Sequence, residues 1–181
     1  LGNCSHEGRL AVCTADATHL PEAGCAGLKG GRRLKELTVT PRTNFNGPLL
    51  NELVLAKPRE HWIESAEGTP IQCWVMSPPT PRRRRAPAVL EVHGGPHCLY
   101  GTTFFHEFQV LAAAGHVVVY SNPRCSKGYG EDHCSAIQGK WGQADWEDIQ
   151  AVSRFMQQLP DVHPDRLAIM GGSYGGYMTN W

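Results

Sequence analysis

Largely apolar runs alternate with amphipathic stretches along the second half of the chain. The runs at 88–92, 117–120 and 167–170 are apolar at nearly consecutive positions, which is typical of strands buried on both faces of a parallel sheet. Between them, residues 102–114 and 145–159 carry apolar side chains at the three- and four-residue spacing of helices. This alternation predicts an α/β fold in which helices cover both faces of a parallel sheet.

Local signals indicate where the helices end and where a hairpin precedes the first strand. Gly115 is expected to terminate the first helix, and Asp145, with an acid three residues later, predicts the N-cap of the second. Residues 60–65 and 71–77 are strand-like and flank a turn at Gly68. We therefore expect them to form a β-hairpin.

The first 50 residues follow a different pattern, without helical periodicity. Residues 9–13 form a short strand-like run. Turn-forming residues follow it at Pro21, Gly24, Gly27, Gly30 and Gly31. A piece of this kind buries too little surface to fold alone. We expect residues 1–50 to end a larger β domain that begins before residue 1, and residues 51–181 to belong to a second, α/β domain.

The last apolar run leads directly into Gly-x-Ser-x-Gly at residues 171–175. This layout is typical of a nucleophile elbow, a strained turn that exposes one serine hydroxyl beyond the end of a buried strand. At Gly171 and Gly175 we expect a β-carbon to collide with a neighbouring strand or helix. Ser173 is the candidate nucleophile, and the backbone N–H of Tyr174 is a candidate oxyanion donor. A glycine-rich turn without catalytic function is the alternative.

A second motif, His-Gly-Gly-Pro at residues 93–96, follows the strand at 88–92. In many α/β-hydrolases a glycine-rich loop at this point supplies a second oxyanion donor, here the backbone N–H of Gly95. The loop precedes the elbow by two strands, as that topology requires, so we favour this function over a plain tight turn. We expect His93 to hold the loop by hydrogen bonds, because these hydrolases order serine, acid and histidine along the chain.

Other polar side chains do not predict a cofactor or a metal site. Gly-Gly-Pro between His93 and His97 prevents the helical turn that would bring both rings together as zinc ligands. The acids Asp145, Glu147 and Asp148 fit helix capping and the helix dipole better than general acid catalysis. We expect no cofactor and no metal.

The amino-acid composition limits which binding partners and which cellular location we expect. The chain has 17 basic and 17 acidic residues, so no global field attracts nucleic acid or an anionic membrane. The basic run at 82–85 lies among prolines and indicates a solvated loop, with a localisation signal or nucleic-acid patch as the alternative. No apolar run reaches the roughly 18 residues of a membrane span.

The seven cysteines form no Cys-x-x-Cys pair, which favours free thiols and a cytoplasmic location. We interpret Cys98 and Cys125 as incidental.

An ordered set of motifs resembles the prolyl oligopeptidase family of serine peptidases. The motifs are His93–His97, Asn122–Gly130, Trp141-Gly142, Asp145-x-x-Asp148 and Gly171–Tyr177. The His-Gly-Gly-Pro form is most similar to the acylaminoacyl-peptidase and dipeptidyl-peptidase-5-like branch. The resemblance spans about residues 50–181.

The resemblance implies an N-terminal β-propeller that screens substrates by size and an α/β-hydrolase domain that cuts short peptides near their N-termini. It implies Ser173 as nucleophile, with Gly95 and Tyr174 as oxyanion donors, and a structural role for Arg124. Cys125 departs from the glycine usual in the family at that position, so we expect the neighbouring loop to be shaped differently. A homo-oligomer of the complete protein is compatible with this assignment.

The chain ends eight residues after Ser173, before the aspartate and histidine that the family places further along. We therefore expect a partial α/β-hydrolase, preceded by the tail of a propeller, that is inactive on its own. We also expect its last strand to be an unpaired edge that favours aggregation. Two alternatives stay open: an esterase or lipase of the same fold, and a non-catalytic propeller-hydrolase binding protein.

Overall fold

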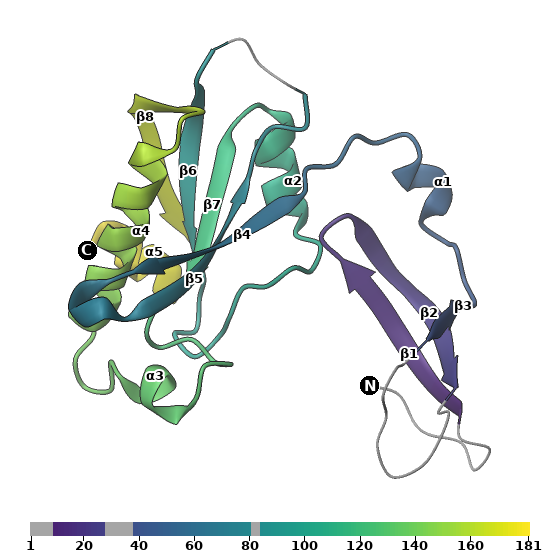
Figure 1. Cartoon of the computed structure of the whole chain (residues 1–181), viewed down its shortest axis with the longest axis horizontal. Helices are drawn as coiled ribbons and strands as arrows, with labels where there is room; N and C mark the ends of the chain where they lie inside the picture. The colour runs from purple at the N-terminus through teal and green to yellow at the C-terminus, as the bar shows by residue number, and fades with distance from the viewer. Residues whose placement is uncertain (1–8, 28–37, 81–83) are drawn as a thin grey trace. The chain divides into compact units, whose positions relative to one another are not determined.

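The computed structural model in Figure 1 describes residues 9–27, 38–80 and 84–181. The chain divides into two compact units. The first unit reaches Val54 and includes Thr102–Phe104, and the second contains the remaining residues. In the described part of the chain, no helix combines the length and the apolar character needed to cross a lipid bilayer.

The first unit contains an antiparallel sheet with strand order β1-β2-β3. Its elements are β1 (Arg9–Asp16), β2 (His19–Gly27), β3 (Val39–Pro41) and the short helix α1 (Gly47–Leu50). The strand predicted at 9–13 is confirmed and extends to Asp16.

Three of the residues expected in turns, Pro21, Gly24 and Gly27, instead lie inside β2. Close approach of the neighbouring strands explains Gly24, because a β-carbon there would lie 2.7 Å from a methyl carbon of Val39 and 3.3 Å from one of Val12. Gly30 and Gly31 fall outside the described residues.

The second unit is built on a five-stranded sheet with order β4-β5-β7-β6-β8. The strands are β4 (Pro58–Glu64), β5 (Pro70–Met76), β6 (Ala86–Val92), β7 (Val117–Asn122) and β8 (Val162–Gly171). The predicted hairpin is confirmed as β4 and β5, joined through the 3-10 turn η1 (Ala66–Gly68), with Gly68 at φ +72°. β6 pairs in parallel with β7 and β8.

The expected parallel sheet is therefore wrong in one respect, because the sheet is mixed. β5 pairs antiparallel with β7, so the hairpin extends the parallel part on one side. The continuous apolar runs correctly predicted strands that are buried on both faces. Such runs carry no information about which strand pairs with β7.

Four helices complete the unit: α2 (His106–Ala113), α3 (Glu131–Ser135), α4 (Ala144–Gln158) and α5 (Tyr174–Asn180). α2 begins four residues later than predicted and stops before Gly115, which has φ +95°. The N-cap of α4 is Gln143, not Asp145 as predicted. Asp145 lies inside the first turn of this helix, where its carboxylate is buried.

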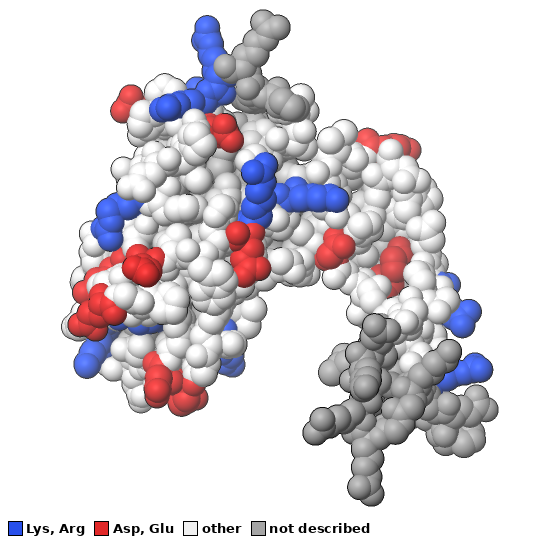
Figure 2. Space-filling view, in the orientation of Figure 1, with Lys and Arg blue, Asp and Glu red and all other residues white. Residues whose placement is uncertain are grey.

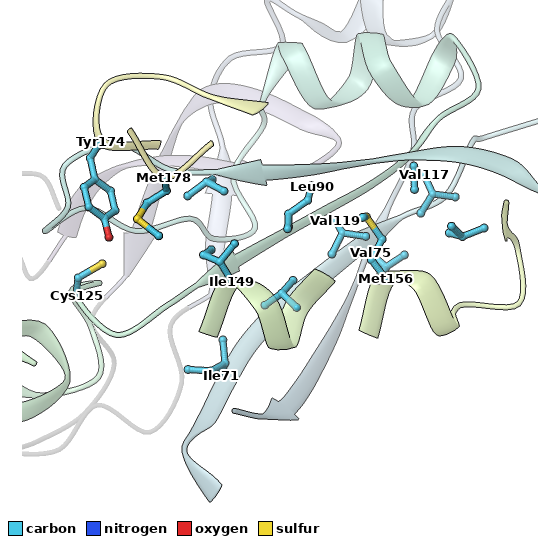
Figure 3. Packing of buried hydrophobic residues seen from close by; sticks show 14 of the residues in the cluster. Ile71, Val75, Leu90, Val117, Val119, Cys125, Ile149, Met156, Tyr174 and Met178 are labelled. Atoms are coloured by element: carbon cyan, nitrogen blue, oxygen red, sulfur yellow. The ribbon is translucent and has the colours of Figure 1, made fainter. Parts of the chain in front are cut away.

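Alternating side chains along the central strands build two apolar clusters, one on each face of the sheet. Val117 and Val119 of β7 belong to the cluster that includes Ile149 and Met156 of α4 (Figure 3). Their neighbours on β7 pack with Phe108 and Ala112 of α2. The prediction that helices cover both faces is confirmed.

Charged side chains of both signs lie on the face of the protein that Figure 2 draws. Figure 2 shows acidic and basic groups interspersed on the face in view, in keeping with a formal net charge of zero.

Candidate active site

The turn after β8 has the strained geometry expected of a nucleophile elbow. Ser173 adopts φ +58° and ψ −121° and is exposed to solvent. A non-glycine residue in such a conformation costs on the order of 1–3 kcal/mol and persists only where its surroundings hold it. α5 begins with the next residue, Tyr174.

The two glycines that flank Ser173 are required by close packing, as predicted. A β-carbon on either Gly171 or Gly175 would overlap with the carbonyl oxygen of Val92, the last residue of β6. A β-carbon on Gly171 would also lie 2.8 Å from the carbonyl carbon of Gly175. The end of β6 and the elbow are therefore in direct backbone contact.

The His-Gly-Gly-Pro loop lies beside the elbow. A β-carbon on Gly94 would be 3.4 Å from Cβ of Ser173. Gly95 has φ +126°, and a β-carbon there would crowd the backbone nitrogens of His97 and Cys98. Among the described residues, neither the Gly95 nor the Tyr174 backbone N–H has a hydrogen-bond partner. The Tyr174 N–H directly follows Ser173 in the chain, and the Gly95 N–H belongs to the loop whose Gly94 lies beside Ser173.

His93 holds this loop, as the sequence predicted. It is buried, with Nδ1 at 2.7 Å from the Gly94 carbonyl oxygen and Nε2 at 2.8 Å from Oγ of Ser126. Oγ of Ser126 also lies 2.7 Å from the Pro123 carbonyl oxygen. Burial lowers the pKa of His93, and both ring nitrogens have hydrogen-bond partners other than Ser173.

The Ser173 hydroxyl itself forms no hydrogen bond with any residue that the structure describes. A serine alcohol without a neighbouring base is a poor nucleophile at neutral pH. The geometry therefore provides the exposed hydroxyl and two amide donors, and the described side chains do not supply the base.

Arg124 and Asp148 form an ion pair in which the carboxylate is fully buried and the arginine side chain is 14% exposed. The backbone N–H of Arg124 donates to Asp148 at 2.7 Å, and its guanidinium donates to the same carboxylate at 2.8 and 3.0 Å. Asp148 has no exposed surface. Several interactions raise the pKa of Arg124, and the largest is its side-chain hydrogen bond to Asp148. The interpretation of Asp148 as a dipole partner at a helix end is corrected, because this carboxylate binds the loop after β7.

The other acids of α4 also differ in role. Glu147 is exposed and makes an outer contact with Arg124 at 3.1 Å. Asp145 is fully buried and accepts hydrogen bonds from the backbone N–H of Gly142 and the hydroxyl of Tyr174. The sequence suggested helix capping for both acids. It gave no sign of the bond between Asp145 and Tyr174, because these residues are 29 positions apart along the chain.

The two cysteines near the site, Cys98 and Cys125, differ in exposure. Cys125 is buried at φ +126°, and burial raises the pKa of its thiol to about 12. Cys98 is an exposed free thiol. Across the described ranges, no group of three or more histidine, cysteine or acidic side chains is arranged to hold a metal ion.

A cavity of about 460 Å³ lies away from Ser173, along α4 and β8. Apolar side chains dominate its lining, including Leu90, Ile149, Leu167, Ile169 and Met178. Neither Ser173 nor Gly95 contributes to it.

Comparisons with known proteins identify the family. Residues 102–181 match the prolyl oligopeptidase family. An uncharacterized peptidase, YuxL, from Bacillus subtilis is 43% identical over 141 residues, which are 77% of this chain and 22% of the relative. A probable dipeptidyl-peptidase 5 from Emericella nidulans is 36% identical over 117 residues, which are 62% of this chain and 16% of that protein.

A solved structure gives the same assignment. The acylaminoacyl peptidase of Pyrococcus horikoshii superposes with a TM-score of 0.83 and 32% identity, covering 96% of this chain and 27% of that chain. The chain thus spans about a quarter of that structure's length, and 22% of its Bacillus relative's. The matched segment, residues 102–181, therefore belongs to the prolyl oligopeptidase family, and the chain as a whole is similar to its members.

Proposed function

We propose that the complete protein containing this chain is a serine peptidase that hydrolyses short peptides near their N-termini through an acyl-enzyme on Ser173. The observation that carries the proposal is the strained, exposed Ser173 beside the loop that bears Gly95. Relatives named dipeptidyl-peptidase 5 and acylaminoacyl peptidase support the class of substrate.

The chemistry follows from these positions. The Ser173 oxygen attacks the carbonyl carbon of the scissile peptide bond and loses its proton to a base. The backbone N–H groups of Gly95 and Tyr174 donate to the resulting oxyanion, each typically contributing about 2.7–4 kcal/mol to transition-state stabilisation. The C–N bond then breaks, the amine leaves with a proton, and water hydrolyses the ester on Ser173.

The domain assignment is part of the same proposal. Residues 1–50 would end a β-propeller, which the antiparallel sheet of the first unit supports. Residues 51–181 would form the N-terminal part of the peptidase domain. The six described cysteines are free thiols, which supports a reducing, cytoplasmic location.

Labelling with a fluorophosphonate tests the proposal. The complete protein should be labelled on Ser173, as located by peptide mapping, and Ser173→Ala should abolish both labelling and hydrolysis of aminoacyl or acylaminoacyl anilides. Cleavage of esters but not of anilides would favour an esterase instead. Absence of labelling in a folded protein would favour a binding protein.

A further inference from the structure

Asp145 is an unusually well bonded carboxylate in the first turn of α4. Oδ1 accepts the backbone N–H of Trp146 at 3.0 Å, and Oδ2 accepts the N–H of Gly142 at 3.1 Å. The hydroxyl of Tyr174 donates to the same Oδ2 at 2.5 Å. Within the described residues, no lysine or arginine forms an ion pair with this buried group. The donors to this carboxylate are two backbone N–H groups and one hydroxyl. Hydrogen bonds from neutral donors to a carboxylate are stronger than those between two neutral groups.

The Tyr174 side chain is held at its ring as well as at its hydroxyl. It is 4% exposed, and its ring lies edge-on to Trp141 with 5.1 Å between centroids. Figure 3 shows its hydroxyl pointing toward Cys125, at one end of the apolar cluster. Burial, and then the hydrogen bond to Asp145, raise the pKa of Tyr174 well above its ordinary value. The hydroxyl therefore stays protonated and remains a donor.

The backbone of the same residue carries a candidate oxyanion donor. Tyr174 is the first residue of α5 and follows the strained Ser173. The amide nitrogen of Tyr174 is bonded directly to Cα, so a shift of the anchored side chain would displace the N–H as well. On the other side, Gly171 and Gly175 press against the Val92 carbonyl. The position of the Tyr174 N–H thus depends on its side-chain anchor.

We propose that Asp145 is a positioning residue that, through the Tyr174 hydroxyl, directs the Tyr174 backbone N–H toward the oxyanion formed at Ser173. The proposal rests on the proposed peptidase function. Asp145 does not touch the substrate. Its effect arises because an N–H misplaced by about 1 Å lowers a catalytic rate on the order of 100-fold.

A double-mutant cycle in the complete protein tests this role. Tyr174→Phe, Asp145→Asn and the double variant should each lower kcat for an aminoacyl anilide by about 10- to 100-fold, with KM within twofold. The double variant should lose no more than the more impaired single variant, because both changes break one hydrogen bond. The rate of fluorophosphonate labelling of Ser173 should fall in parallel.

Tyr177→Phe is the matched control. Tyr177 lies on the same helix and its ring stacks near that of Tyr174, but its hydroxyl has no hydrogen-bond partner among the described residues. Its kcat should change less than twofold. If Asp145→Asn fails to fold, Tyr174→Phe, which removes one oxygen atom, still decides the question.

The outcomes separate this inference from the proposed function. If Tyr174→Phe lowers the melting temperature but leaves kcat unchanged while turnover still requires Ser173, the positioning role is rejected and the peptidase function stands. Additive losses in the double variant would also reject it. If Ser173→Ala retains full turnover, both proposals are rejected.

Discussion

At the scale of single residues, the elbow depends on one backbone carbonyl. Val92 ends β6, and its carbonyl oxygen occupies the space in which β-carbons of Gly171 and Gly175 would lie. Gly172, in the same turn, has open space at its β position. The close approach of the Val92 carbonyl therefore requires glycine at positions 171 and 175, but not at position 172.

Gly175→Ala should destabilise the chain by about 1–3 kcal/mol, because the new methyl group forces β6 and α5 apart. Gly172→Ala, in the same turn, is the control and should change stability by less than about 0.5 kcal/mol. Urea unfolding followed by tryptophan fluorescence measures both. Equal midpoints for the two variants would contradict this account of the elbow.

A second residue, Glu91 on β6, is buried, and its Oε1 has no hydrogen-bond partner in the part of the chain that the structure describes. Burial, followed by the charge of Glu107, raises the pKa of Glu91 to about 7 from 4.5. The folded state thus holds a proton that the unfolded state releases above pH 4.5. The contribution of Glu91 to stability is therefore most favourable below pH 4.5, declines as pH rises toward 7, and is fully unfavourable above it.

Glu91→Gln should therefore stabilise the chain at pH 8, by an amount on the order of 3 kcal/mol at most, and change stability little near pH 4.5. Urea unfolding of both proteins across this pH range gives the comparison. Glu107→Gln, at an exposed position, should have a much smaller effect. The interpretation fails if the gain from Glu91→Gln is the same at both pH values.

At the scale of elements, the loop after β7 is fastened to the first turns of α4. Arg124 bonds Asp148 through its backbone and its guanidinium, and it also reaches the carbonyl oxygen of Ala144. Asp148 is fully buried, whereas Glu147 is exposed. The same arginine therefore makes one ion pair inside the protein and one at its surface.

Arg124→Gln should destabilise the chain by about 3–5 kcal/mol, because it leaves the Asp148 charge buried without a cation. Glu147→Gln removes the exposed partner of the same arginine and should cost less than about 1 kcal/mol. Thermal unfolding by circular dichroism distinguishes the two. A loss for Glu147→Gln as large as that for Arg124→Gln would refute the distinction between the buried and the surface pair.

At the scale of the whole molecule, β8 pairs with β6 along one side only among the described strands. Its Ala168 is exposed, and the apolar cavity beside α4 opens along the same strand. An unpaired strand edge with apolar neighbours is a template for association with other chains.

The 181-residue chain studied alone should self-associate through this edge. Ala168→Lys should shift the distribution toward monomer, because an edge lysine opposes strand pairing. Gln158→Lys adds the same charge on the exposed surface of α4 and should have little effect. Light scattering over a range of concentrations measures both, and a monodisperse monomer of the unmodified chain would show that the edge is protected.

The same chain should show no measurable anilide hydrolysis, because no described side chain contacts the Ser173 hydroxyl as a base. The complete protein is the comparison, assayed at equal molar concentration. Turnover by the 181-residue chain that is lost in Ser173→Ala would show that another residue of this chain supplies the base.

Local sequence alone determined the elements and the two loops of the candidate site. Strand runs and turn glycines depend on near neighbours, so the hairpin at Gly68, the end of α2 before Gly115 and the turn at Ser173 could all be predicted. The His-Gly-Gly-Pro loop could be predicted for the same reason, because its shape is set by glycine and proline within four residues.

Tertiary structure decided which partners these elements meet. The antiparallel pairing of β5 with β7, and the burial of Asp145 and Asp148, depend on residues 24 to 50 positions away along the chain. A carboxylate in the first turn of a helix has the same sequence signature whether it faces water or a distant tyrosine. Only the packing of α4 against the loop after β7 and the start of α5 distinguishes the two.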